Sequence, residues 1–371
     1  MTRRERFEAI MKKQPVDRVI YDFAGTPQTG VEACCTEKLK KLLGIEGEYT
    51  GSYPMYDERI LEALDIDTRR VGALFEPSSP LIRIEGKRAY DCWGVGREFT
   101  GLYWDIVENP LRGCDEKMIE DYPFPDAANI DRKMIHAIAE QAKRLYYDTE
   151  YVVCAEHPTY GVMEIGCWMM GFDEYLYKLA IEPEVIEKFS NRVLQYQKDV
   201  FELYYGAIGD YIHLTTCGDD YGMQSGSFMS KDMFDEMILP YIKERVKTIK
   251  SMTKGYFWQH TCGSVFNLIP SLIEAGVDIL NPIQPGAKDM EPDKLKRAYG
   301  DKIVFWGGVD TQHLLVEGTV DDVKASVKQI LADMQGTGYV LAAAHNIQCD
   351  VPAENVLAIF QGANEYFGIS H

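Results

Sequence analysis

Short apolar segments alternate with longer amphipathic ones along this chain, and this alternation limits its fold more than any other feature. Eight segments read as strands: 18–23, 68–74, 151–155, 210–215, 254–260, 277–280, 302–306 and 339–343. Between most of them the apolar residues recur at helical spacing, for example over 131–147, 232–251 and 320–335. Strands joined through helices run parallel, and eight of them predict a (β/α)8 TIM barrel. A doubly wound open sheet is the alternative.

Two regions fall outside this alternation. Residues 2–13 read as a helix in which Thr2 and Glu5 form a capping box and which Pro15 ends. Residues 80–110 carry Tyr, Trp and Gly in short alternating runs, which favours hairpins. We therefore expect a single barrel domain over 1–371 with an N-terminal helical and hairpin elaboration, in which residues 80–110 form a lid.

Charge and cysteine content narrow the class of protein. A formal net charge of −19 argues against nucleic acid or an anionic membrane as the main partner. The first residues lack the apolar stretch of a signal peptide, and no apolar run is long enough to span a membrane. The nine cysteines follow no disulfide framework, and the adjacent Cys34 and Cys35 lack a metal-binding spacing. We expect a cytoplasmic protein with reduced thiols.

Polar side chains gather where the predicted strands end. They are Asp22, Glu156, His157, Cys217, Asp219, Asp220, His260, Cys262, Asn281, Gln284, Asp310, His345, Asn346 and Cys349. In a barrel the carboxyl ends of all strands lie on one face, and enzymes with this fold keep their active sites there. We expect the active site on that face.

Three of these residues suit a metal ion. His260 and Cys262 are two residues apart at the end of one predicted strand, so their side chains would point to the same face. Cys349, after the last predicted strand, would add a third ligand. One imidazole and two thiolates suit Zn²⁺, and three protein ligands leave the fourth position open, as in catalytic sites. Buried cysteines also serve as small apolar core residues, which is the alternative.

Several motifs together resemble the uroporphyrinogen decarboxylase superfamily and, within it, the zinc-dependent corrinoid methyltransferases. They lie at 3–6 with 15–18, 218–224, 260–263, 276–284, 306–311 and 345–348. The resemblance implies that family's type of barrel, with zinc held by His260, Cys262 and Cys349. The decarboxylases of the family carry an arginine-rich loop after the first strand, which holds substrate carboxylates. Here the corresponding residues 23–29 contain no arginine, so decarboxylation of a porphyrinogen is disfavoured.

The function that the resemblance implies is O-demethylation. The segment 345–348 is similar to ether-demethylating members, which pass a methyl group from a methoxylated, here aromatic, substrate to the cobalt of a corrinoid (cobalamin) on a separate protein. The alternatives are methyl transfer from methylcobalamin to a thiol or folate, and a non-catalytic protein with structural zinc. A homodimer is one option for the assembly.

Roles follow for individual residues. Asp219 and Asp220 are the expected catalytic groups that orient or protonate the substrate, although one of them could instead cap the next helix or pair with a lysine. Glu164 is the expected fourth zinc ligand in the resting state. Tyr160, Trp168 and Tyr221 could line a pocket for an aromatic ring or belong to the core. The expected substrate contacts are Tyr221, Gln224, Asn281, Asp310, His345 and Asn346.

Overall fold

Eight parallel strands form the central sheet of the computed structural model, which describes residues 1–48, 56–72, 83–85, 87–100 and 104–369. They are β1 (Ile20–Tyr21), β2 (Thr68–Val71), β7 (Val152–Ala155), β8 (Leu214–Gly218), β11 (Tyr256–His260), β12 (Ile279–Ile283), β13 (Val304–Gly307) and β14 (Tyr339–Leu341). Their order is β1-β14-β13-β12-β11-β8-β7-β2. The amide of Asp67 donates to the carbonyl oxygen of Tyr21 at 3.0 Å and so links the first strand to the last in this order. The predicted barrel is confirmed.

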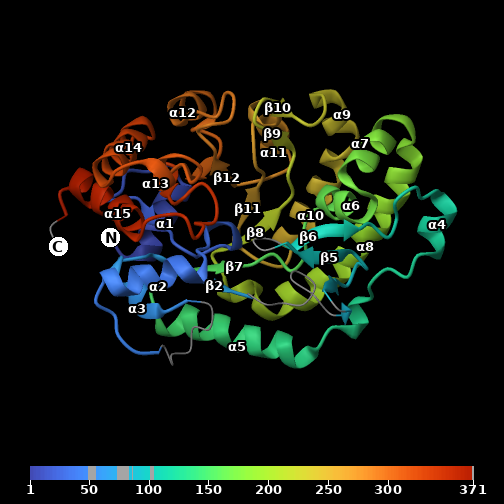
Figure 1. Cartoon of the computed structure of the whole chain (residues 1–371), viewed down its shortest axis with the longest axis horizontal. Helices are drawn as coiled ribbons and strands as arrows, with labels where there is room; N and C mark the ends of the chain where they lie inside the picture. The colour runs from blue at the N-terminus through green and yellow to red at the C-terminus, as the bar shows by residue number, and fades with distance from the viewer. Residues whose placement is uncertain (49–55, 73–82, 86, 101–103, 370–371) are drawn as a thin grey trace.

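Helices surround this sheet (Figure 1). They are α1 (Arg3–Met11), α2 (Ala33–Leu42), α3 (Glu58–Ala63), α4 (Glu116–Asp121), α5 (Arg132–Asp148), α6 (Val162–Met170), α7 (Phe172–Ile181), α8 (Pro183–Ile208), α9 (Lys231–Met237), α10 (Leu239–Lys250), α11 (Ile269–Glu274), α12 (Pro292–Tyr299), α13 (Leu314–Glu317), α14 (Val320–Asp333) and α15 (Ala353–Phe367). The predicted capping box of Thr2 and Glu5 begins α1. The predicted helix 232–251 is two helices, because Pro240 has no N–H to continue the first and suits the start of the second.

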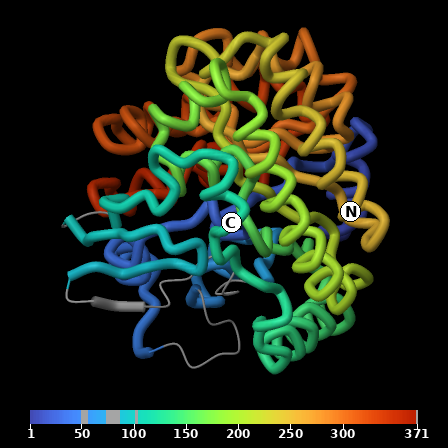
Figure 2. The backbone as a smooth tube through the Cα atoms, turned by 90° about the vertical axis from the view of Figure 1, so that its right-hand side faces the viewer, coloured from blue at the N-terminus to red at the C-terminus, as the bar shows by residue number. Residues whose placement is uncertain are grey.

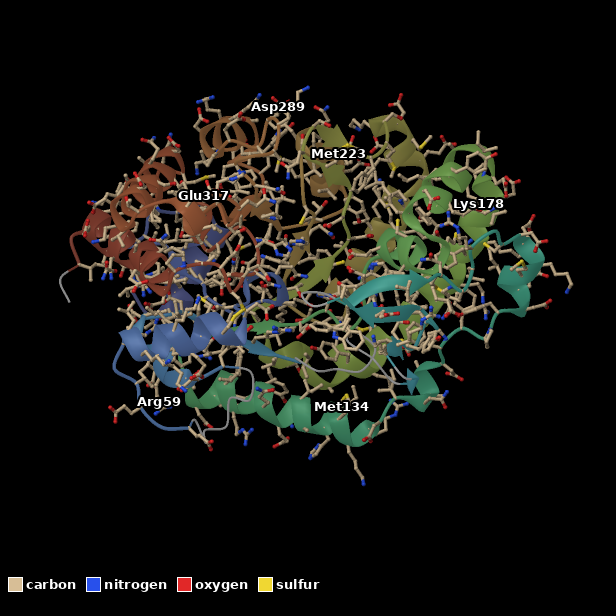
Figure 3. All side chains as sticks on the ribbon, viewed as in Figure 1. Arg59, Met134, Lys178, Met223, Asp289 and Glu317 are labelled. Atoms are coloured by element: carbon tan, nitrogen blue, oxygen red, sulfur yellow. A yellow bond between two sulfur atoms is a disulfide. The ribbon has the colours of Figure 1, made fainter. Side chains whose placement is uncertain are left out.

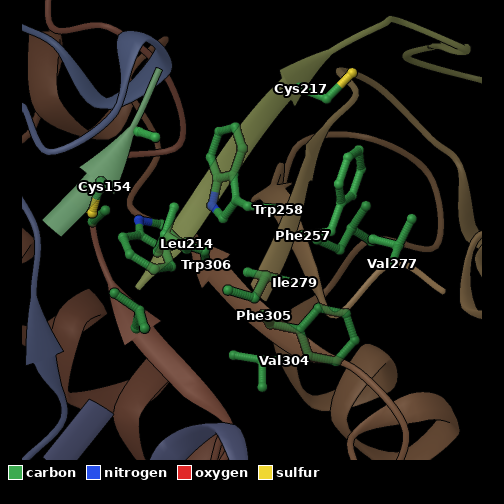
Figure 4. Close-up of a cluster of buried hydrophobic side chains, with 14 of the residues drawn as sticks. Cys154, Leu214, Cys217, Phe257, Trp258, Val277, Ile279, Val304, Phe305 and Trp306 are labelled. Atoms are coloured by element: carbon green, nitrogen blue, oxygen red, sulfur yellow. The ribbon is translucent and has the colours of Figure 1, made fainter. Parts of the chain in front are cut away.

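The strand side chains fill the barrel. Every residue of β7, β8, β12, β13 and β14 is buried, as expected for parallel strands covered on both faces. Trp258 and Trp306 meet edge to face at 6.3 Å, and Figure 4 shows Phe257 and Phe305, their chain neighbours, pointing to the other side of the sheet. The indole N–H of Trp306 donates to the buried Asp22 carboxylate at 2.7 Å. The packed interior leaves the strand ends as the place for a site.

A second, antiparallel sheet lies outside the barrel. It contains β3 (Arg83–Glu85), β4 (Arg88–Tyr90), β5 (Gly96–Phe99) and β6 (Trp104–Glu108), which confirms the predicted hairpins; residues 80–82, 86 and 101–103 lie outside the described part of the chain. Figure 2 shows this segment in turquoise at the left of the molecule. The segment after β6 is hydrogen-bonded to α6, since the Asn109 side chain donates to the carbonyl oxygen of Trp168 at 2.8 Å.

A short hairpin follows β8 directly. It consists of β9 (Gly222–Met223) and β10 (Gly226–Ser227), and it contacts the loop after β11, where the amide of Ser264 donates to the Met223 carbonyl at 2.8 Å. Met223 is exposed and is labelled near the top of Figure 3. In the described part of the chain, no helix combines the length and the apolar content needed to cross a membrane.

Candidate active site

Three side chains with metal-binding atoms meet at the ends of β11 and β14. They are His260, Cys262 and His345, and one ligand atom from each lies within 4.8 Å of the others. The Sγ of Cys262 is 3.2 Å from the Nε2 of His260. The rings of His260 and His345 are 5.4 Å apart between centroids. We call these three residues the metal group.

Neighbouring residues hold the His260 ring in place. Asn281 donates its amide N–H to the carbonyl oxygen of Trp306 at 3.1 Å, so its Oδ1, 2.7 Å from the His260 Nδ1, accepts the proton there. Trp258 stacks on the same ring at 6.0 Å. The lone pair of Nε2 is therefore turned toward Cys262, and a metal-binding histidine is oriented through its other nitrogen in this way. Asn281, predicted as a substrate contact, is buried and positions His260 instead.

Cys349 does not belong to the metal group in this structure. Its sulfur is bonded to Cys34 at the start of α2, and the yellow bond beside α2 in Figure 3 is this disulfide. The predictions of Cys349 as a zinc ligand and of uniformly reduced thiols are thereby corrected, and His345, predicted as a substrate contact, stands in the third place. A parallel bridge between Val31 and Ile347 brings the two cysteines together across 315 residues of sequence. Local spacing carries no information on such a contact.

The loop that carries His345 is fixed by the segment before α2. The amide of Gly30 donates to the Oδ1 of Asn346 at 2.7 Å, and the amide of Ile347 donates back to the Gly30 carbonyl at 3.0 Å. A Cβ on Gly30 would lie 2.9 Å from the same Asn346 oxygen, so a larger residue at position 30 would displace the Asn346 side chain. Asn346, predicted as a substrate contact, thus anchors this loop.

The two neighbouring aspartates do different work. Asp219 is buried, accepts from the Tyr221 hydroxyl at 2.9 Å, and accepts from the Glu164 amide at 2.7 Å. It therefore caps the first turn of α6, an earlier helix, and not the next helix as the alternative to a catalytic role had it. The Oδ1 of Asp220 accepts from the Cys262 amide at 2.8 Å and lies 3.7 Å from the His260 Nε2. Asp220 is the aspartate that faces the metal group.

Burial sets the protonation states around the metal group. It lowers the pKa of His260, and it lowers that of His345 to about 4, so both rings are neutral near pH 7 and can offer a lone pair. Burial, together with Asp220 and Asp219, raises the pKa of Glu164 well above its ordinary value. Burial and then Asp220 also raise the pKa of the Cys262 thiol. Crowded carboxyl groups beside a thiol and two neutral imidazoles favour a bound cation.

The donor set fits zinc. Imidazole nitrogen and thiolate sulfur are the atoms that zinc prefers, and three protein ligands leave one position open, as in catalytic sites. The metal group supplies two such nitrogens and one sulfur. Asn281 supplies the hydrogen bond to the first histidine. The residues that would hold zinc here are therefore His260, Cys262 and His345.

Two cavities lie near the metal group: Cys262 and His345 line the first, and Asp220, which contacts Cys262, lines the second. The mouth cavity, of about 480 Å³, is lined by the β9–β10 hairpin and by the loops after β11 to β14; its walls include Cys262, His345, Gln224 and Asp310. The aromatic cavity, of about 430 Å³, lies between the antiparallel sheet and α6; its walls include Glu164, Trp168, Phe172 and Asp220. Phe228 lines both. Gln224 and Asp310, two of the predicted substrate contacts, line the mouth cavity, and their role stays a prediction.

The other predicted ring contacts lie outside these two cavities. Tyr221 is buried and lines only a tight internal space next to Asp219. Tyr160 packs edge-on between Trp168 at 4.7 Å and His157 at 4.5 Å. His345 as a metal-binding residue is the main feature that the sequence reasoning missed. The available signal was its position in the loop after the last strand, four residues beyond β14, among the other polar residues at the strand ends.

Comparison with known proteins identifies the family. The family model described as "Uroporphyrinogen decarboxylase (URO-D)" matches residues 107–366. The chain belongs to this family. The resemblance seen in the sequence motifs is therefore confirmed, and the barrel is the fold expected of a URO-D member.

Two relatives are methyltransferases. The structure of a "methyltransferase from Methanosarcina mazei" covers 99% of this chain and 99% of that one, with a TM-score of 0.70 and 17% identity, which shows a shared fold. The "Methylcobamide:CoM methyltransferase MtaA" of Methanosarcina barkeri is 25% identical over 143 residues. That match spans 38% of this chain and 39% of MtaA, well under half of either protein.

Proposed function

We propose that this URO-D family member is a methyltransferase that passes the methyl group of a methoxylated aromatic substrate to the cobalt of a corrinoid carried by a partner protein. The observation that carries the proposal is the convergence of His260, Cys262 and His345 at the strand ends, beside the mouth cavity that Cys262 and His345 line. The similarity to two methyltransferases supports it. The loop 23–29, which lacks arginine, argues against a polycarboxylate substrate.

The metal group would hold zinc, which when bound supplies a Lewis acid for the ether oxygen that loses its methyl group, while the corrinoid supplies the methyl acceptor. Around it, Asn281 keeps the His260 ring oriented. Asp220 holds the Cys262 loop through the 2.8 Å hydrogen bond and lines the aromatic cavity, so its carboxylate can orient a substrate hydroxyl. Glu164 lies in the wall of the same cavity and would be the fourth zinc ligand of the resting state.

The test is an anaerobic assay. The zinc-loaded protein is mixed with cob(I)alamin and a methoxyphenol, and the cobalt spectrum is followed. Methylcobalamin and the demethylated phenol should form in equal amounts. His345→Ala should abolish this turnover, whereas His136→Ala should keep it, because His136 is an exposed histidine on α5, away from the strand ends. Absence of methylcobalamin with every ether tested would contradict the proposal.

A second candidate function is methyl transfer from methylcobalamin to a thiol. The observation that favours this reaction is the similarity to MtaA, whose name states methylcobamide and CoM. The same three ligands suit this reaction, because zinc lowers the pKa of a bound thiol. Demethylation of methylcobalamin by a thiol, with no cleavage of any ether, would establish this second candidate and exclude the first. A folate acceptor belongs in the same panel.

A further inference from the structure

We infer that the aromatic cavity binds the ring of the methyl donor and that this ring carries no negative charge. The inference rests on the proposed function and deepens it. Its first basis is size. A ligand pocket typically measures about 300–1,000 Å³, and about 150 Å³ suffices for benzene. The aromatic cavity of about 430 Å³ therefore has room for a ring with a methoxy group and further substituents.

The walls of the cavity suit a flat ring. Phe172 and Phe228 meet edge to face at 4.9 Å, and Phe172 is 47% exposed although it is a large apolar residue. Trp168 is held in place by two neighbours, since Tyr160 packs against it at 4.7 Å and the Arg97 guanidinium lies 4.7 Å from its ring. Aromatic side chains that are locked in position give a ring-shaped ligand offset-stacked or edge-to-face contacts at low entropic cost.

The charge of the cavity selects among rings. Glu164, Asp173 and Asp220 contribute three carboxyl groups to its wall. The cation in the wall, Arg112, is already paired with Asp173 through two contacts at 3.0 and 2.5 Å. A carboxylate on the ligand would meet the like charge of the Asp220 carboxylate, since the Arg112 charge is already neutralised by Asp173, whereas a phenolic hydroxyl could donate to Asp220. The cavity therefore favours an uncharged phenol ether over a methoxybenzoate.

The position of the cavity fits the chemistry. Asp220 in its wall is 2.8 Å from the Cys262 amide and 3.7 Å from the His260 Nε2, so a ring in the cavity lies beside the metal group. Cys262 and His345 line the mouth cavity, and Phe228 lines both cavities. The donor can thus occupy one cavity while the methyl acceptor approaches through the other. Transfer in line between two reactants requires such an arrangement.

The experiment measures binding without any corrinoid. The zinc-loaded enzyme is titrated with 2-methoxyphenol and with 4-hydroxy-3-methoxybenzoate, which differ by one carboxylate, and the dissociation constants are compared by calorimetry. The dissociation constant of the neutral phenol should be at least about tenfold lower than that of the benzoate. Phe228→Ala should weaken phenol binding about tenfold. Phe99→Ala, the matched control, should leave it unchanged, because Phe99 is exposed on β5 and outside the cavity wall.

A second variant, Asp173→Asn, tests the inference that the bound ring carries no negative charge. Asp173→Asn frees the Arg112 guanidinium, so the benzoate should bind several-fold more tightly while the phenol is unaffected; Asp173 is largely exposed, and its loss should not disturb folding. Equal binding of the two rings by the natural protein, or no response of the benzoate to Asp173→Asn, would overturn the charge assignment.

The outcomes separate this inference from the proposed function. Phenol binding that depends on Phe228, without any methylcobalamin in the turnover assay, would overturn demethylation and leave only a ring site. Demethylation with the same KM in Phe228→Ala as in the natural protein would overturn the ring site and leave the demethylation proposal intact.

Discussion

Replacing His345 by alanine should weaken zinc binding strongly, whereas removing the sulfur of Cys349 should not. In the structure His345 lies with His260 and Cys262 in the metal group, and Cys349 is bonded to Cys34. The two positions are four residues apart on one loop, so both variants perturb the same segment. The comparison therefore isolates the ligand role from any general effect on the loop.

The magnitude follows from the number of ligands. Structural zinc sites bind with about 10–16 kcal/mol through four ligands, so one ligand contributes roughly 2.5–4 kcal/mol. Each 1.4 kcal/mol is about a factor of ten in the dissociation constant. Loss of one of the three ligands of the metal group should therefore raise the zinc dissociation constant about 10²- to 10³-fold.

The assay is competition for zinc between the protein and a chromophoric chelator, with zinc content after dialysis as a second measure. The partner variant is Cys34→Ser with Cys349→Ser, which leaves no unpaired thiol, and it should keep an affinity within about threefold of the natural protein. Circular dichroism should show an intact fold for both, because the buried barrel core does not include the metal. If the double serine variant loses zinc as strongly as His345→Ala, or if His345→Ala retains zinc, the assignment of the third ligand is wrong.

Three further predictions concern stability and pH. Asp67→Ala removes a fully buried carboxylate that pairs with three arginines. The free energy of unfolding measured in urea should therefore fall by about 3–5 kcal/mol. A fall of less than about 1 kcal/mol would show that the arginines find other partners. Reduction of the Cys34–Cys349 bond, which closes a loop of 315 residues, should cost up to about 5 kcal/mol by chain entropy, and an unchanged urea midpoint in dithiothreitol would contradict this. Burial, with a smaller contribution from Arg4, lowers the pKa of His213 from 6.5 to about 4, and its Nδ1 accepts from the Val153 amide. The folded state thus binds fewer protons, so its stability should be complete above pH 6.5 and decline toward pH 4, and His213→Gln should flatten this slope.

Much of the fold could be predicted from the spacing of apolar and capping residues along the sequence. Helical spacing and short apolar runs predicted the parallel barrel, because side chains repeat with different periods in helices and strands. The capping box of Thr2 and Glu5 is a contact between residues three apart. The pair His260 and Cys262 was readable for the same reason, since strand geometry determines where residues two apart will point.

The tertiary structure alone decided which residues complete the site. Asp219 and Asp220 are adjacent, yet one caps α6 and the other faces the metal group. His345 and Cys349 share one loop, yet the bridge between Val31 and Ile347 directs Cys349 toward α2, while His345 meets the end of β11. Loop side chains have no periodicity that indicates their direction. Their direction depends on the backbone path, and here that path is set by contacts with a segment about 300 residues earlier in the chain.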